Sequence, residues 1–273
     1  MELIHIENIS CPEAAPYAEL TGAQLRHAGE GRGLFIAESL LVAAAAAEAG
    51  YRPVSFLAEE EKFRRIEEAF PDLDAPVYTA RPEALERLTG FRLSRGVLCA
   101  MERIPLPSPE EVLKCASRIA VLEGITDPTN VGAIFRSAAA LGMDAVLVGS
   151  SCCEPLHRRA ARVSMGAVFR IPWAVLGAAG DGIGTDVGFL RERGFTTAAA
   201  ALSPDAIPVT DPALRNATRL AVLLGSEGNG LAKETIAACD MTVTIPMAHG
   251  VDSLNVAAAS AVLFWETGKS RKA

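Results

Sequence analysis

Short apolar runs alternate with helix-like segments from residue 117 onward, and this alternation constrains the fold more than any other feature of the chain. Strands that alternate with helices indicate an α/β domain with a mostly parallel sheet. The expected strands are Ile119–Leu122, Ala145–Val148, Phe195–Leu202, Leu220–Leu224 and Met241–Ile245. Helices are expected between and after them, at 127–141, 156–168, 186–193, 232–238 and 254–266.

Three prolines within Ile104–Glu110 indicate a linker between two domains. We therefore expect an N-terminal domain of residues 1–105, a linker of residues 106–116 and a C-terminal domain of residues 117–273, both domains being of ordinary size. The N-terminal region alternates as well, which predicts a smaller α/β domain. Its expected helices are 34–49 and 60–70, and its expected strands are Val54–Ala58 and Gly96–Met101.

The net charge of −7 argues against a nucleic-acid partner, because contacts to phosphates need Lys and Arg. Between Asn130 and Arg170, however, cations outnumber acids. A solvated helix face produces the same pattern, so RNA contact and plain solvation both remain open for this run. The cations between Asn130 and Arg170 are Arg136, Arg158, Arg159, Arg162 and Arg170, and the acids are Asp144 and Glu154. RNA contact and plain solvation are likewise both open for the N-terminal cations Arg26, His27, Arg32, Arg92 and Arg95.

Other classes of protein are disfavoured by what the sequence lacks. It has no run of about 18 uncharged apolar residues, so we expect no membrane span. The N-terminus does not resemble a secretory signal. Six scattered cysteines without a C-x-x-C pair, and only four histidines, predict free thiols and no metal site. A cytoplasmic protein is the resulting expectation.

Three unusual loops follow predicted strands, at Glu123–Asn130, Gly225–Gly230 and Pro246–Asn255. Ligands of open α/β sheets bind beyond the carboxyl ends of the strands, so converging loops there predict a binding cleft. The glycines of the second loop match neither the phosphate loop nor the G-x-G-x-x-G dinucleotide pattern. Taken singly, each signal has a plain structural explanation. The second loop could be a turn, for example, and Ser253 and Asn255 could cap the last helix.

In this order, the three segments resemble the motifs of the SpoU/TrmH family of ribose methyltransferases. Asn130–Arg136 resembles the first motif, Leu224–Leu231 the second and Ile245–Val256 the third, while Arg162–Ala167 resembles the helix between the first two. The resemblance covers about residues 118–267. The N-terminal region more loosely resembles the ribosomal-protein-like substrate domain of the family. Its F-x-x-E-G start would correspond to Phe35–Glu38, with Ser39 in place of the usual glycine.

The resemblance implies a SPOUT-type fold with a C-terminal knot that forms the pocket for S-adenosylmethionine. It also implies a structured RNA substrate, ribosomal or transfer, and a homodimer with the active site near the subunit interface. The implied catalytic positions are Asn130, Arg136, Glu227, Ser253 and Asn255. The implied cofactor-binding positions are Leu224, Gly225, Ile245, Met247 and Leu254.

Methyl transfer from a sulfonium is an in-line displacement that needs a positioned hydroxyl and help with loss of its proton. A guanidinium normally stays protonated, so Arg136 is expected to hold a phosphate and stabilise negative charge on the 2′-oxygen. The role in proton removal that is proposed in the family stays open, as does whether Glu227 orients Arg136 or is structural. His249 is expected to be a peripheral loop residue.

Two other functions are compatible with parts of this pattern. One is a catalytically silent RNA-binding or ribosome-assembly factor on the same fold, although such a factor has no physical reason to keep all five implied catalytic residues. The other is a Rossmann-type enzyme with a different nucleotide, which the glycine order disfavours. The sequence therefore predicts an RNA ribose 2′-O-methyltransferase.

Overall fold

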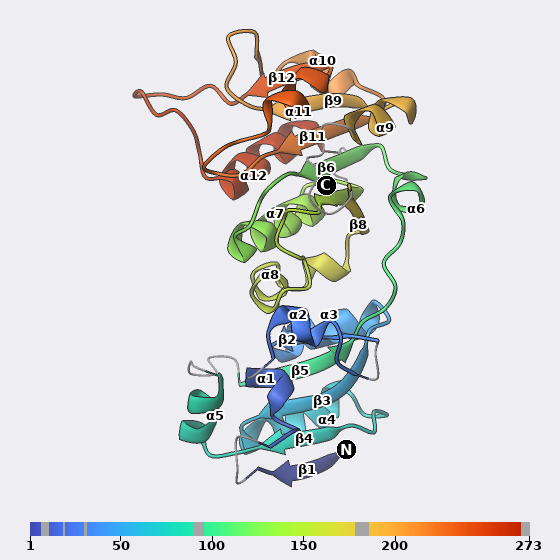
Figure 1. Cartoon of the computed structure of the whole chain (residues 1–273), viewed down its shortest axis with the longest axis vertical. Coiled ribbons are helices and arrows are strands. Elements are labelled where there is room, and N and C mark those ends of the chain that lie inside the picture. Colours follow the sequence, from blue (N-terminus) through green and yellow to red (C-terminus); the bar gives the residue numbers. More distant parts are fainter. Residues whose placement is uncertain (7–10, 19, 30–31, 90–95, 178–185, 269–273) are drawn as a thin grey trace. The chain divides into compact units, whose positions relative to one another are not determined.

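The computed structural model describes residues 1–6, 11–18, 20–29, 32–89, 96–177 and 186–268. The chain divides into two compact units (Figure 1). Unit 1 comprises Met1–Pro105 and Leu156–Phe169, and unit 2 comprises Leu106–Pro155 and Arg170–Ala273. The sequence predicted two continuous domains, whereas the segment Leu156–Phe169 packs with the N-terminal residues.

Unit 2 is built on a seven-stranded sheet in the order β10-β12-β9-β11-β6-β7-β8. Every neighbouring pair is parallel, which confirms the predicted α/β fold class. The sequence analysis missed β8 and β10. The strands are β6 (Arg118–Leu122), β7 (Ala145–Gly149), β8 (Trp173–Leu176), β9 (Thr196–Ala200), β10 (Ile207–Pro208), β11 (Leu220–Leu224) and β12 (Met241–Thr244).

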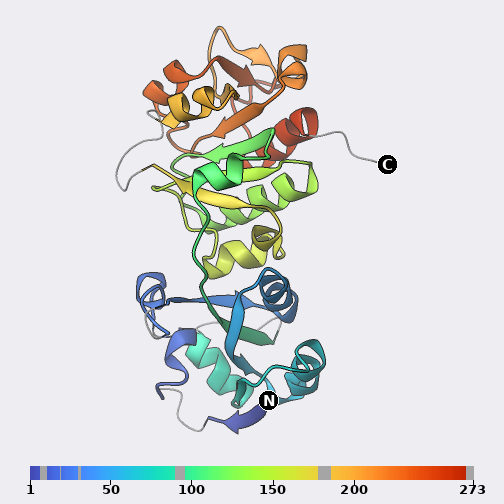
Figure 2. The same ribbon diagram turned by 90° about the vertical axis from the view of Figure 1, so that its right-hand side faces the viewer.

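Helices cover both faces of this sheet (Figure 2). On one face, α6 (Pro109–Leu113), α9 (Asp186–Glu192) and α11 (Lys233–Ala238) pack on alternate strand residues such as Val121 and Leu223. On the other face, α7 (Pro128–Ala140) and α12 (Val256–Thr267) pack against each other, and α10 (Pro212–Asn216) contacts α12. Because both faces are covered, strands such as β7 and β11 are apolar along their whole length.

Unit 1 contains a mixed five-stranded sheet in the order β1-β4-β3-β5-β2. Strands β1, β4 and β3 are parallel, while β5 runs antiparallel to β3 and β2. The strands are β1 (Glu2–His5), β2 (Leu34–Glu38), β3 (Arg52–Ala58), β4 (Pro76–Thr79) and β5 (Val97–Glu102). The helices are α1 (Ala15–Ala18), α2 (Gly22–Leu25), α3 (Leu40–Glu48), α4 (Phe63–Ala69), α5 (Pro82–Thr89) and α8 (Arg158–Val163).

The predicted helix 34–49 is wrong in its first part, because Leu34–Glu38 forms strand β2 and helix α3 begins at Leu40. A mostly apolar run such as residues 34–49 has no period that separates a buried strand from a buried helix. Ser39 lies between the two elements with φ of 94°, a backbone conformation that favours glycine. This conformation explains why the resembled motif has glycine at that position.

Two other expectations need correction. The predicted linker 106–116 contains helix α6, whose Val112 and Leu113 are buried. Its signal was present in the sequence, because Ser108 and Glu111 form a capping box. The predicted helix 156–168 is also interrupted, since α8 ends at Val163 and the next turn has positive φ at Met165 and Gly166.

Two arginines of the run considered for RNA contact are engaged within unit 1. The buried carboxylate of Glu38 accepts a hydrogen bond from Arg162 at 2.8 Å and lies 3.6 Å from the guanidinium of Arg158. Arg159 is exposed. Two of the five arginines of the run therefore pair with Glu38. Among the N-terminal candidates Arg26, His27 and Arg32 are exposed, whereas Arg92 and Arg95 lie outside the described residues.

Two further findings concern membranes and metals. None of the helices in the described part of the chain is long and apolar enough to cross a membrane. Within the same residues, no three His, Cys, Asp or Glu side chains are grouped so as to hold a metal ion.

The guanidinium of Arg219 joins three segments of unit 2, and we predict that Arg219→Lys destabilises this unit by about 2–3 kcal/mol. Arg219 donates to the carbonyl oxygens of Leu113, Ala116 and Arg193 and stacks on the Phe195 ring at 4.1 Å. An ammonium group cannot reproduce this planar set of contacts.

Both tryptophans lie in unit 2, so urea unfolding followed by tryptophan fluorescence reports on this unit. The control is Arg215→Lys, at an exposed ion pair with Glu266, which should cost less than about 1 kcal/mol. Equal losses in the two variants would contradict the role given to Arg219.

Candidate functional site

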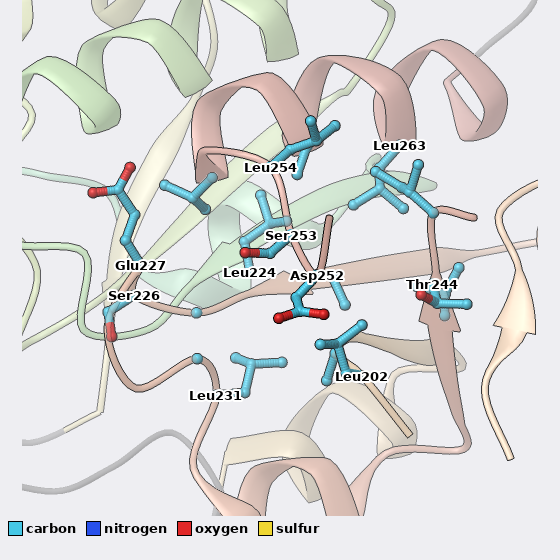
Figure 3. Close-up of a pocket in the computed structure, with 18 of the residues that line it drawn as sticks. Leu202, Leu224, Ser226, Glu227, Leu231, Thr244, Asp252, Ser253, Leu254 and Leu263 are labelled. Atoms are coloured by element: carbon cyan, nitrogen blue, oxygen red, sulfur yellow. The ribbon is translucent and has the colours of Figure 1, made fainter. Parts of the chain in front are cut away.

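A cavity of about 400 Å³ lies beyond the carboxyl ends of β9, β11 and β12 (Figure 3). This is the edge of the sheet at which the sequence predicted a binding cleft. The second and third predicted loops line the cavity, but no residue of the first loop, Glu123–Asn130, does. The lining comprises residues 200–202, 224–231, 236, 243–245, 247, 252–254, 256, 259 and 263.

The second loop is a tight turn that is closed by its own backbone. Ser226 and Gly230 exchange two backbone hydrogen bonds, at 3.2 and 2.9 Å. A Cβ on Gly225 would lie 2.1 Å from the backbone carbon of Gly230, so position 225 has no room for a side chain. The loop therefore presents backbone groups to the cavity at this point.

The third loop ends where Asn255 caps helix α12. The side-chain oxygen of Asn255 accepts hydrogen bonds from the backbone N–H groups of Ala257 and Ala258, at 3.0 and 3.3 Å. The sequence predicted that this helix begins at Leu254, whereas it begins at Val256. His249 is exposed with φ of 58° and does not line the cavity, in agreement with a peripheral position.

The side-chain amide of Asn255 joins the three loops. It donates to the side-chain oxygen of Asn130, at 3.1 Å, and to the carboxylate of Glu227. Asn130 is buried at the start of α7, whereas Glu227 and Asn255 are exposed. Three of the five residues implied as catalytic thus form one hydrogen-bonded cluster, although they lie far apart in the sequence.

The other two implied catalytic residues behave differently. Ser253 lines the cavity. Arg136 is exposed on α7, outside the cavity lining, and its guanidinium has no hydrogen bond or ion pair with any residue that the structure describes. A single copy of the chain therefore does not bring Arg136 to the cluster.

All five residues implied in cofactor binding line the cavity, namely Leu224, Gly225, Ile245, Met247 and Leu254. The sequence analysis missed several apolar walls, among them Leu202, Leu231 and Leu263 (Figure 3). Leu202 ends a predicted strand and Leu231 follows a predicted loop, so both could have been found from their positions alone.

The charged side chains that line the cavity, among the residues that the structure describes, are all acidic. Glu227 and Asp252 contribute the acidic groups, and the lining contains no Lys, Arg or His. The carboxylate of Asp252 lies near the side chains of Ser253 and Leu202 (Figure 3). The sequence analysis did not select Asp252, although it precedes Ser253 directly in the third motif. Such a cavity suits a ligand that has an apolar body and a positive charge.

Comparisons with known proteins agree with this geometry. Residues 117–265 match the SpoU rRNA methylase family. A protein of Mycobacterium bovis, named as an uncharacterized tRNA/rRNA methyltransferase, is 39% identical over 241 residues, which cover 88% of this chain and 82% of the relative. The 23S rRNA (guanosine-2′-O-)-methyltransferase RlmB of Acinetobacter baylyi is 25% identical over 219 residues, which cover 78% of this chain and 86% of RlmB.

The fold has solved counterparts as well. The AdoMet-bound rRNA methyltransferase of Sinorhizobium meliloti superposes with a TM-score of 0.79 and 22% identity, and the match covers 97% of each chain. The family match spans more than half of the chain and includes all three motifs. The chain therefore belongs to the SpoU rRNA methylase family of RNA methyltransferases, as its motifs predicted.

Proposed function

We propose that the protein transfers a methyl group from S-adenosylmethionine to a ribose 2′-hydroxyl of ribosomal or transfer RNA. The observation that carries this proposal is the cavity, which is apolar, contains two carboxylates and is lined by no basic residue among those described. A phosphorylated nucleotide would meet repulsion from Glu227 and Asp252. The sulfonium of S-adenosylmethionine is a cation, so the same carboxylates favour it.

The residues present suit this cofactor in shape as well as in charge. Leu224, Met247 and Leu254 offer apolar walls for the adenosine, and the backbone at Gly225 and Ile245 offers hydrogen-bonding groups, at Gly225 without an intervening side chain. When bound, S-adenosylmethionine supplies a methyl group that is activated by its positive sulfur.

The hydrogen-bonded cluster supports a positioning role for three residues. Asn255 is held by the N-terminus of α12 through its oxygen, so its amide has one orientation towards Asn130 and Glu227. We assign to this cluster and Ser253 the task of holding the ribose in line with the methyl group. Arg136 holds an RNA phosphate and stabilises negative charge on the 2′-oxygen.

We further propose a cytoplasmic homodimer, with the C-terminal knot that the family resemblance implies. The position of Arg136 outside the cavity of its own chain supports an active site near a subunit interface. An apolar strip on α12 supports the dimer, because Val262 is 36% exposed and Trp265 is 60% exposed. A catalytically silent factor is not favoured, since the cluster of Asn130, Glu227 and Asn255 is assembled.

The proposed reaction is tested by incubating bulk RNA with the protein and methyl-labelled S-adenosylmethionine, followed by nucleoside analysis. We expect labelled 2′-O-methyl nucleosides. Arg136→Ala should lower the rate at least about 100-fold, as is typical when a group that stabilises charge in the transition state is lost. Its cofactor affinity should stay within about twofold, because Arg136 does not line the cavity. Label on a base instead of a ribose would refute the proposed reaction.

Substitutions at two glycines of the second loop test whether this loop forms the cofactor site. A Cβ at Gly225 meets backbone at 2.1 Å, whereas a Cβ at Gly228 meets nothing within 4 Å. We predict that Gly225→Ala weakens S-adenosylmethionine binding at least about tenfold, or 1.4 kcal/mol, in titration calorimetry. Gly228→Ala should leave the affinity within about twofold. If both variants bind alike, the loop does not form the cofactor site.

The oligomeric state is tested by sedimentation velocity at micromolar concentration, where we predict a dimer. Trp265→Lys should shift the protein to the monomer, because the charge would have to be buried in an apolar interface. Val175→Lys, at an exposed apolar residue on β8, is the matched control and should remain dimeric. A wild-type monomer would refute the dimer.

A further inference from the structure

Glu123 touches both ends of the second loop, although it has no part in the proposed reaction and does not line the cavity. It follows β6 directly and is only 8% exposed. Its backbone N–H donates to the carbonyl oxygen of Leu224 at 2.9 Å, where the loop begins. Its side-chain Oε1 accepts from the backbone N–H of Ala232 at 3.0 Å, where the loop ends.

The reach of this side chain follows from the strand that precedes it. Side chains alternate along a strand, so Glu123 lies on the same face as Ile119 and Val121, the face on which α11 packs. Ala232 is the N-cap residue of α11, which begins at Lys233, and its side chain cannot cap the helix. The backbone N–H of Ala232 donates to the carboxylate of Glu123, which follows β6 and lies at the end of the helix that favours negative charge.

Stability alone does not explain a carboxylate at this position. Oε2 of Glu123 is buried and has no hydrogen-bond partner among the residues that the structure describes. A buried carboxylate with an unbonded oxygen is costly, and a neutral acceptor would satisfy Ala232 at a smaller desolvation cost. What the carboxylate adds is a stronger, charge-assisted bond to the end of the loop.

We propose that Glu123 is a positioning residue for methyl transfer, which holds the two ends of the loop 225–231 together before the cofactor binds. The loop contains Gly225, the proposed backbone contact of the cofactor, and Glu227, which bonds to Asn255. Fixing the loop in advance lowers the ordering cost of binding. This inference rests on the proposed function of the loop as the site of S-adenosylmethionine.

The test compares two variants of Glu123 that differ in what they keep. Glu123→Gln keeps the acceptor and loses the charge, while Glu123→Leu keeps much of the volume and loses the acceptor. Because Leu leaves the half-buried N–H of Ala232 without the acceptor that Glu123 provides, we expect the dissociation constant of this variant for S-adenosylmethionine to rise about 10- to 100-fold. For Gln we expect about threefold, since a neutral bond is weaker than a charged one.

Asp144 provides a matched control at the opposite end of the same strand. Its carboxylate accepts from the backbone N–H groups of Ser117 and Arg118, at 2.7 and 2.9 Å, and does not touch the loop. Asp144→Asn and Asp144→Leu should lower the melting temperature but leave the cofactor affinity of the folded protein within about twofold. A purely structural role for Glu123 predicts equal effects in both pairs of variants, and that result would overturn the proposal.

Hydrogen exchange without cofactor separates this inference from the proposed function. In Glu123→Gln, backbone amides of residues 225–232 should exchange at least about threefold faster than in the wild type, with the rest of unit 2 unchanged. This measurement also decides the matter if Glu123→Leu does not fold. Unchanged exchange in the loop would refute the role of Glu123. Failure of the wild type to bind S-adenosylmethionine would refute the proposed function instead.

Discussion

The parallel pairing of β6 with β11 is the constraint on which the rest of the site depends. In this register Leu122 lies beside Leu224, so the loops that follow the two strands begin side by side. Glu123 then bonds to both ends of the second loop. The third loop returns to the same edge and ends at Asn255, whose amide bonds to residues of the other two loops.

The distribution of charge is the second feature that shapes the molecule. Several arginines donate to backbone carbonyl oxygens, because a guanidinium satisfies carbonyl groups at helix ends that would otherwise lack donors. Arg118, for example, donates to the carbonyl oxygens of Thr218, Arg215 and Thr267. The charged residues among those described that line the cavity are both acids, Glu227 and Asp252. Because the net charge of the protein is −7, any contact that it makes with phosphate groups depends on local exposed cations, and Arg136 is exposed.

The fold of unit 2 was largely predictable from the sequence, and the fold of unit 1 was less so. Strands such as Leu220–Leu224 are short apolar runs bounded by loops, and the structure has them at the predicted positions. The run Leu34–Ala37 is also apolar, but helix α3 follows it closely, and no period marks the junction at Ser39. The excursion of Leu156–Phe169 into unit 1 depends on ion pairs with Glu38 more than 100 residues earlier, which no local pattern reveals.

By itself the sequence determined the α/β class, the family and the residues of the three motifs, because these depend on local periodicity and on the order of rare residue types. Only the tertiary structure decided which of those residues meet. It joined Asn130, Glu227 and Asn255 through one amide and left Arg136 outside the cavity. It also placed Asp252 in the cavity lining and Glu123 against the end of the second loop. The physical reason is that strand register and loop closure set these contacts, and both arise from pairing between segments far apart in the chain.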